Sequence, residues 1–281
     1  MENIRMIALD LDGTLLASDH ETLSPQNRTV LEAAAARGVE IVVATGRSIS
    51  AIAPQVMELP FLRYFITGNG SAVTSRDGTP IYQRLIPAEI ALPLVEHLTA
   101  EGGYLTQLYA NGRMFISQKD WDLGHSTQLM PHHLRALALG PHGIVPDLLD
   151  CLKEQGGEAE KINIPYIEAE QKEALCRWIQ QRFSGKLRAV SSLPWNLELN
   201  HADACKGGAL LALCEQLEIS PEACTAFGDA DNDVEMLQAA GVGVAMGNAQ
   251  PAVKAAADMV TLTNDESGVA AALGCLLGLE Y

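Results

Sequence analysis

The stretch LDLDGTLLAS, from Leu9 to Ser18, decides how the rest of the chain is interpreted. An Asp-Gly pair between apolar residues predicts a tight β-hairpin turn when it is considered alone. The same stretch places two carboxylates, Asp10 and Asp12, on one side of an extended segment, where they repel each other. The pair is therefore either a solvated surface turn or part of an active site, and the remaining sequence distinguishes the two.

Strands and helices alternate in the first part of the chain. The apolar run Ile4–Leu11 suits a buried parallel strand, and Ser24, followed by a proline, predicts the start of a helix. A second buried strand lies at 39–46, a further capped helix begins near Ser48, and a third strand lies around 64–67. This order is typical of a doubly wound parallel α/β sheet.

The middle of the chain follows another pattern. Two alternating runs flank Asn111 and Gly112, the strongest hairpin signal in the sequence, and helices and further strands follow to about residue 199. The strand–helix alternation returns with KGGALLALCEQL and continues to DMVTLT near the end. The sequence therefore predicts a Rossmann-like doubly wound core in two pieces, 1–85 and 195–281, with an inserted α+β cap domain, 86–194.

Composition excludes several classes of partner. The chain of 281 residues carries a formal net charge of −16, which argues against nucleic acid or an anionic membrane as the main partner. We expect no secretory signal, because charged residues precede any long apolar run near the first residue, and no apolar stretch of roughly 18 residues predicts a membrane span. The six cysteines are scattered without a C-x-x-C pair, which favours reduced thiols and a cytoplasmic location. The sequence leaves the oligomeric state open.

Polar groups gather where strands end or helices begin. In a parallel α/β sheet, ligands bind beyond the carboxyl ends of the strands. The polar groups at these points form four stations: Asp10 with Asp12, Thr45 with Gly46, Lys206, and Asp229 with Asn232 and Asp233. We therefore expect the four stations to meet at one edge of the sheet.

The segments that carry these stations resemble a known family. DLDGT, ATGR, the Lys206-Gly207 helix start and GDADND are similar, in order and spacing, to the four motifs of the haloacid dehalogenase superfamily of phosphohydrolases. The large insert between the second and third motifs resembles the Cof-type subfamily. The resemblance spans the core from end to end, and it implies a Rossmann-like core with an α/β cap.

The two acids of the opening stretch suit different tasks. Asp10, at the strand end, is the candidate nucleophile that forms an aspartyl-phosphate, and Mg²⁺ with oxygen ligands is the cation that best neutralises the charges involved. Asp12 is the candidate acid for the leaving alcohol and base for water, because neighbouring carboxylates favour one protonated partner. The resemblance also implies that the Asp12 backbone carbonyl binds the metal and that the Leu11 amide donates to phosphate. Gly13 allows the tight turn between them.

Two further stations suit phosphate binding. The Thr45 hydroxyl and the Gly46 amide are suitable donors to phosphate oxygens, although a threonine that merely ends a strand is an alternative. Lys206 opens a helix, where the helix dipole mildly disfavours a cation, so a functional reason for it gains weight. Its ammonium can stabilise the charge of a transition state.

The GDADND segment is a candidate metal site of another kind. As an EF-hand loop it fails, because Val234 stands where a glycine is needed and Ala240 where an acid is needed. As a strand-to-helix turn, it makes Asp229 a metal ligand, Asn232 a phosphate donor and Asp233 an acid that orients Lys206 or metal-bound water.

Some other polar residues resemble parts of a metal or substrate site, but their pattern does not predict one. His125, His132 and His133 lack a further clear metal ligand. Lys161 and Asn163, in the predicted cap, either face the substrate or form a solvated strand face.

These observations predict a cytoplasmic Mg²⁺-dependent phosphatase of a small phosphorylated metabolite. Sugar phosphates are the first expectation, since Cof-type relatives often act on them, and phosphorylated cofactors come next. A phosphomutase and a phospho-ligand sensor remain alternatives. We then predict a sharp turn, and not a hairpin, at Asp12 and Gly13. Any hairpin lies further on, with its tip near Asp19 and His20.

Overall fold

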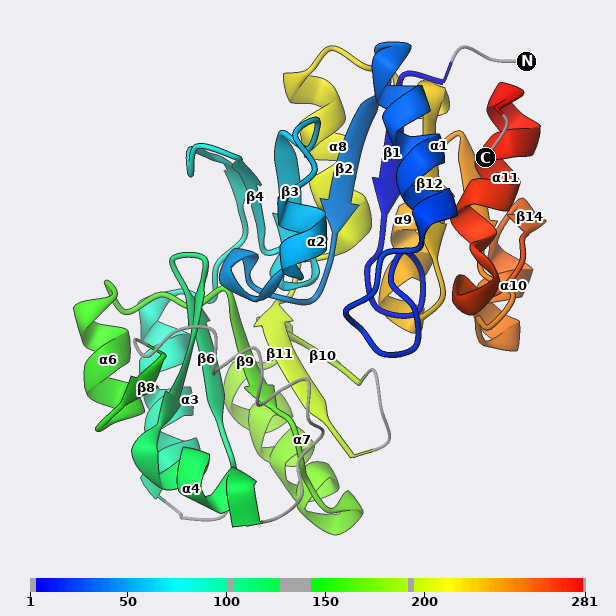
Figure 1. The fold of residues 1–281 in the computed structure, drawn as a ribbon. Helices are drawn as coiled ribbons and strands as arrows, with labels where there is room; N and C mark the ends of the chain where they lie inside the picture. The colour runs from blue at the N-terminus through cyan, green and yellow to red at the C-terminus, as the bar shows by residue number, and fades with distance from the viewer. Residues whose placement is uncertain (1–3, 101–103, 127–142, 192–194, 280–281) are drawn as a thin grey trace. The chain divides into compact units, whose positions relative to one another are not determined.

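The computed structural model describes residues 4–100, 104–126, 143–191 and 195–279. Within them the chain forms two units, each with its own sheet (Figure 1). The first unit comprises Met1–Gly46, Ile52–Gln83 and Cys205–Tyr281, and the second comprises Arg47–Ala51 and Arg84–Ala204. No helix among the described residues is both long enough and apolar enough to cross a membrane.

The first unit is built on an eight-stranded sheet in the order β14-β13-β12-β1-β2-β3-β4-β5. The six strands from β14 to β3 are parallel, and β4 and β5 extend the sheet as antiparallel strands. The strands are β1 (Met6–Leu9), β2 (Glu40–Ala44), β3 (Tyr64–Thr67), β4 (Ala72–Ser75), β5 (Pro80–Gln83), β12 (Cys224–Gly228), β13 (Val242–Ala245) and β14 (Met259–Val260).

Helices cover this sheet on both faces, as a doubly wound fold requires (Figure 1). On one face, α8 and α9 pack together over a core that contains Met6, Ala8 and Leu210. On the other face, α1 and α11 pack against each other (Figure 1). The helices are α1 (Pro25–Ala36), α2 (Pro54–Met57), α8 (Lys206–Gln216), α9 (Val234–Ala239), α10 (Pro251–Ala256) and α11 (Gly268–Leu277).

Most local predictions for the first 85 residues are confirmed, and one is wrong. Ser24 caps α1, and its hydroxyl accepts a hydrogen bond from the Asn27 amide. The helix predicted near Ser48 is instead a 3₁₀ turn, η1 (Ile49–Ala51), followed by the short α2. Pro54 explains the break, because it forces Ala53 into an extended conformation that a continuous helix does not allow.

The second unit contains a six-stranded sheet in the order β10-β11-β9-β6-β7-β8, antiparallel except between β7 and β8. The strands are β6 (Gln107–Ala110), β7 (Arg113–Ser117), β8 (Ile144–Val145), β9 (Lys161–Ile164), β10 (Leu187–Val190) and β11 (Leu197–His201). The helices are α3 (Ala88–Ala100), α4 (Gln118–Ser126), α6 (Leu148–Glu154) and α7 (Ala169–Phe183). The hairpin predicted at Asn111 and Gly112 is confirmed, and both residues have positive φ, 50° and 71°.

The boundary predicted at residue 195 needs a correction. Strand β11 follows that point, yet it pairs with β9 and β10 in the sheet of the second unit. The return to the first unit therefore falls between Ala204 and Cys205. The error arose because a single strand carries no sign of which sheet it joins. The first boundary, predicted after residue 85, lies between Gln83 and Arg84.

Candidate active site

Parallel pairing places three of the four stations at one edge of the first sheet. Strand β1 lies between β2 and β12, with Leu9 level with Val43 and Phe227. Asp10 follows β1 directly, and its amide donates to the carbonyl of Phe227 at 3.1 Å. Because all three strands run in the same direction, the residues that follow them, Asp10, Thr45 and Asp229, emerge at the same edge.

The chain turns sharply after Asp10 and forms no hairpin there. The amides of Thr14 and Leu16 donate to the Leu11 carbonyl at 3.3 and 2.9 Å. Gly13 has a φ of 83°, and a Cβ at this position would collide with the Asp229 carboxylate. A glycine is therefore required both by the backbone and by the close approach of Asp229.

A short hairpin follows, as predicted. Leu16 and Leu23 form an antiparallel bridge, and Asp19 accepts hydrogen bonds from the amides of Glu21 and Thr22 at the tip. His20, with a φ of 60°, lies at this tip, and its Nδ1 pairs with Asp12 Oδ1 at 2.8 Å. The loop thus brings an imidazole to the candidate acid–base carboxylate.

Lys206 links two of the stations at the start of α8. Its Nζ donates to Asp10 Oδ1 and to Asp233 Oδ1, both at 2.6 Å. Its side chain is only 1% exposed, and those of Asp10 and Asp233 are 7% and 0% exposed. A surface lysine is therefore excluded, and the predicted orientation of Lys206 by Asp233 matches the geometry.

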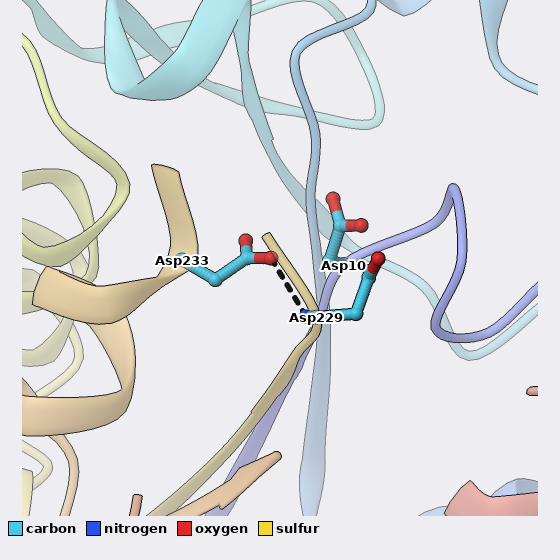
Figure 2. A group of neighbouring side chains, drawn as sticks. All are labelled: Asp10, Asp229 and Asp233. Carbon is cyan, nitrogen blue, oxygen red and sulfur yellow. Dashed lines mark hydrogen bonds between the residues drawn. The ribbon is translucent and has the colours of Figure 1, made fainter. Parts of the chain in front are cut away.

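Asp233 holds the turn that carries Asp229. Its second oxygen, Oδ2, accepts hydrogen bonds from the amides of Asp229 and Ala230, both at 3.0 Å. Asp229 Oδ1 in turn accepts from the Thr14 hydroxyl at 2.9 Å. Figure 2 shows the carboxyl groups of Asp10, Asp229 and Asp233 close together, with the Asp229–Asp233 hydrogen bond dashed; Asp10 and Asp229 follow strands, and Asp233 directly precedes α9.

The cluster is electrostatically unbalanced. Burial raises the pKa of Asp10 well above its ordinary value, against the opposing effect of Lys206. Burial also raises the pKa of Asp229 to about 6, and the charge of Asp233 adds to this. Burial alone would lower the pKa of Lys206, but Asp10 and Asp233 outweigh it and the net pKa is raised. The ammonium therefore stays charged, and one positive charge is shared among three carboxylates.

The donor set fits a hard divalent cation. Oxygen atoms of Asp10, Asp229 and Asp233 lie within 4.8 Å of one another. Asp233 already uses both oxygens, whereas Asp10 and Asp229 each use Oδ1 in the contacts described above. Asp10 and Asp229 are therefore better placed to hold a metal ion, and added positive charge would offset the excess of carboxylates. Asp12 is absent from this cluster of side chains, which leaves its carbonyl as the group predicted to bind the metal.

Asn69, which was not predicted from the sequence, joins Asn232 to Thr45, the station predicted to bind phosphate. Thr45 is fully buried, and its carbonyl accepts from the Asn69 amide at 3.1 Å. The side chain of Asn232 donates from Nδ2 to Asn69 Oδ1 at 3.1 Å. Gly46 directly follows Thr45 at the end of β2, and Leu11 is buried beside Asp10. All the predicted site residues therefore lie in the first unit.

Three more residues that were not predicted lie at the site: Thr14, His20 and Asn248. The side-chain amide of Asn248 donates to the Gly13 carbonyl at 2.8 Å. Thr14 was detectable, because a hydroxyl directly after an Asp-x-Asp-Gly turn is placed near the acids. His20 and Asn248 had no such local signal, since each reaches the site through a loop or a distant segment.

The alternative of a solvated strand face is wrong for Lys161 and Asn163, which are 3% and 2% exposed. Lys161 pairs with Glu198 at 3.2 Å, and Asn163 donates to Gln107 at 2.8 Å, all within the second unit. His125, His132 and His133 lie outside the residues whose side chains the structure describes.

The family can now be tested by comparison. The family model for haloacid dehalogenase-like hydrolases matches residues 7–273. The chain belongs to the haloacid dehalogenase-like hydrolases. It is 32% identical to the phosphatase YwpJ of Bacillus subtilis, covering 95% of this chain and 98% of that protein. It is 31% identical to the 5-amino-6-(5-phospho-D-ribitylamino)uracil phosphatase YcsE of the same organism, covering 96% and 95%.

Solved structures agree. The chain is similar to a sugar phosphatase of subclass IIB in this superfamily, with a TM-score of 0.79, 25% identity, and coverage of 98% of this chain and all of that one. The predicted membership and the Rossmann-like α/β fold are confirmed. This haloacid dehalogenase-like hydrolase is a phosphatase, as its named relatives are.

Proposed function

We propose that this phosphatase is Mg²⁺-dependent, acts on small phosphorylated metabolites and works through an aspartyl-phosphate on Asp10. The observation that carries the proposal is the buried contact of one lysine, Lys206, with Asp10 and Asp233 beside a third carboxylate, Asp229. A carboxylate that is held by an ammonium and lies beside a second carboxylate able to bind a metal is oriented for attack on phosphorus.

Asp10 acts as the nucleophile. An oxygen of its carboxylate forms a bond to phosphorus as the ester bond to the leaving oxygen breaks. Lys206 keeps Asp10 in place through Oδ1 and neutralises charge on the phosphoryl oxygens. Thr45, Gly46, Asn232 and the Leu11 amide donate hydrogen bonds to those oxygens.

Asp12 carries the proton. It gives its proton to the leaving alkoxide, and it then takes a proton from the water that attacks the aspartyl-phosphate. Inorganic phosphate leaves, and the Asp10 carboxylate is restored. The Asp12 side chain is 34% exposed, far more than that of Asp10, so it can exchange protons with solvent, and His20 fixes its position.

Asp10, Asp229 and the carbonyl of Asp12 would hold Mg²⁺, which is hard and prefers oxygen ligands. When bound, this ion supplies positive charge to the phosphoryl oxygens and to Asp10. Asp233 instead positions Lys206 and the Asp229 turn.

The substrate is a small phosphorylated metabolite, with sugar phosphates first and phosphorylated cofactors next. The names of two relatives support this: one is a sugar phosphatase and the other acts on a phosphorylated ribitylaminouracil. We assign the choice of leaving group to the second unit, as a cap domain, because the site residues all lie in the first unit. The strongly negative net charge, −16, does not favour nucleic acid as the substrate.

The test is phosphate release from p-nitrophenyl phosphate and from a panel of phosphorylated metabolites. We expect release with Mg²⁺, its loss in EDTA, and a fall of about 10³-fold or more in kcat for Asp10→Asn. Asp77→Asn, an exposed acid of the same unit, is the matched control and should leave kcat unchanged. Release that survives both EDTA and Asp10→Asn would contradict the proposal.

A further inference from the structure

The turn η2 (Gly68–Gly70), which follows β3, touches three of the four stations. The Asn69 amide donates to the carbonyl of Thr45, and the Asn69 side chain accepts from that of Asn232. Gly70 lies against the backbone where α8 begins, so close that a Cβ there would collide with Cys205 and Lys206.

The sequence Gly-Asn-Gly is dictated by this position. Asn69 has left-handed backbone angles, φ 60° and ψ 28°, which asparagine tolerates better than most residues. Gly70 has a φ of 93° and no room for a side chain. Asn69 is only 4% exposed, so its side-chain amide lies in the interior and is not solvated.

The contact with Asn69 fixes the orientation of the Asn232 amide. Because Asn69 presents its carbonyl oxygen, Asn232 must present an N–H, and this leaves a second N–H on the same nitrogen. The Asn232 oxygen is buried and has no hydrogen-bond partner within the described part of the chain. A buried carbonyl oxygen without a partner is unfavourable, so packing alone does not select this orientation. Asn69 imposes it.

We propose that Asn69 is a positioning residue for phosphate binding, which acts by orienting the Asn232 amide. It makes its own contact with neither phosphate nor metal in this role. The inference rests on the proposed function, because Asn232 is a phosphate donor only in that function. Its test therefore uses a binding measurement that needs no turnover.

The experiment measures the Kd of inorganic phosphate by calorimetry, in Mg²⁺, for the full chain and four variants. Asn69→Gly removes the side chain but keeps the left-handed backbone, and Asn232→Ala removes the donor. We expect each to weaken binding by about 10-fold, the effect of roughly one hydrogen bond to a charged group. The double variant should bind no more weakly than Asn232→Ala alone, because Asn69 acts only through Asn232.

Asn111→Gly is the matched control. Asn111 also has a positive φ, 50°, but it lies in the hairpin of the second unit and donates to Gln155. Its substitution should leave the phosphate Kd unchanged. The melting temperature of the Asn111→Gly variant shows how much stability is lost when glycine replaces an asparagine with a positive φ. A drop in melting temperature for Asn69→Gly that matches the control, with weakened phosphate binding, separates positioning from folding.

Two results would overturn the inference: an unchanged phosphate Kd in Asn69→Gly, or a double variant whose loss equals the product of the two single losses. A wild-type chain that binds phosphate but hydrolyses no ester would contradict the proposed function alone, since the Kd series still decides the role of Asn69.

Discussion

Lys206 is the residue on which the electrostatics of the site depend. An ammonium that is 1% exposed would be costly by itself, and it is stable here because Asp10 and Asp233 each accept a hydrogen bond from it. The same contact keeps Asp10 from repelling a phosphate. The structural role of Lys206 and its proposed catalytic role therefore coincide in one side chain, and a substitution should reveal both.

Lys206→Met tests both roles. We expect kcat to fall by about 10³-fold, because the phosphoryl oxygens lose a cation. The melting temperature should fall more at pH 7.5 than at pH 5, because the carboxylates that surrounded the ammonium are relieved by protonation at the lower pH. Lys153→Met, which removes an exposed lysine paired with Asp150, is the control and should change neither quantity. An equal loss of stability at both pH values would contradict the argument.

Asp229 should make metal binding depend on pH. Its pKa of about 6 lies above the ordinary 3.8, so a proton competes with the cation in this range. Without metal, the folded chain binds this proton more tightly than the unfolded chain, and the contribution of Asp229 to stability falls as pH rises from 3.8 to about 6. Mg²⁺ acts in the opposite sense, because it requires the deprotonated carboxylate.

We therefore expect the rise in melting temperature caused by Mg²⁺ to be small at pH 5 and several degrees larger at pH 7.5. Thermal melts with Mg²⁺ and with EDTA at each pH measure this difference. Asp229→Asn should abolish the rise at both pH values, and Asp77→Asn should preserve it. A rise of equal size at pH 5 and pH 7.5 in the wild type would show that Asp229 does not control binding.

At the scale of elements, the turn between β1 and the hairpin shows how a backbone can be fitted to one side chain. Gly13→Ala should reduce activity by 10-fold or more and destabilise the fold by about 1–3 kcal/mol, because the new methyl group displaces the Asp229 carboxylate. Gly38→Ala is a close control: its φ is 82°, almost that of Gly13, but no atom lies within 4 Å of the added Cβ. It should cost only the backbone strain, about 1 kcal/mol, and keep full activity. Equal kcat values in the two variants, measured together with urea unfolding, would contradict the steric argument.

The elements also show what the sequence could predict. Periodicity and caps were sufficient for β1 to β3, α1 and the Asn111 hairpin, because those signals are local. Strands β4 and β5 and helix α11 were not predicted, since their segments carry no motif and their place depends on neighbours far along the chain. The candidate site residues followed from strand ends and family motifs. His20 reaches Asp12 only because the loop between them folds back, and Asn69 contacts Asn232, which is far away in the sequence.

On the scale of the whole molecule, each of the two units has an apolar core of its own. One contains Leu210 and Met236 of the first unit, and the other contains Ile162 and Leu94 of the second. All three tryptophans, Trp121, Trp178 and Trp195, belong to the second unit, where Trp178 stacks on His97 with ring centroids 3.8 Å apart. Tryptophan fluorescence therefore reports on the second unit, while circular dichroism reports on both.

This arrangement predicts how substitutions in each core affect unfolding in urea. Ile162→Ala should destabilise the second unit by about 2–5 kcal/mol, because a fully buried side chain leaves a cavity. The fluorescence transition should then move to lower urea, and circular dichroism should show an early step and a late step. Leu210→Ala, at an equally buried position of the first unit, should instead move the unfolding of the first unit to lower urea in circular dichroism. It should leave the midpoint of the fluorescence transition nearly unchanged.

The pair of variants decides whether the two units fold independently, because each substitution has the other as its control. Separate shifts would mean that the unit proposed to choose the substrate can change without loss of the unit that holds Asp10 and Lys206. A single transition, detected at the same urea concentration by both probes and shifted equally by both substitutions, would instead mean that the units unfold together. In that case a substitution in either core would also lower the free energy of unfolding of the unit that carries Asp10, Asp229 and Asp233.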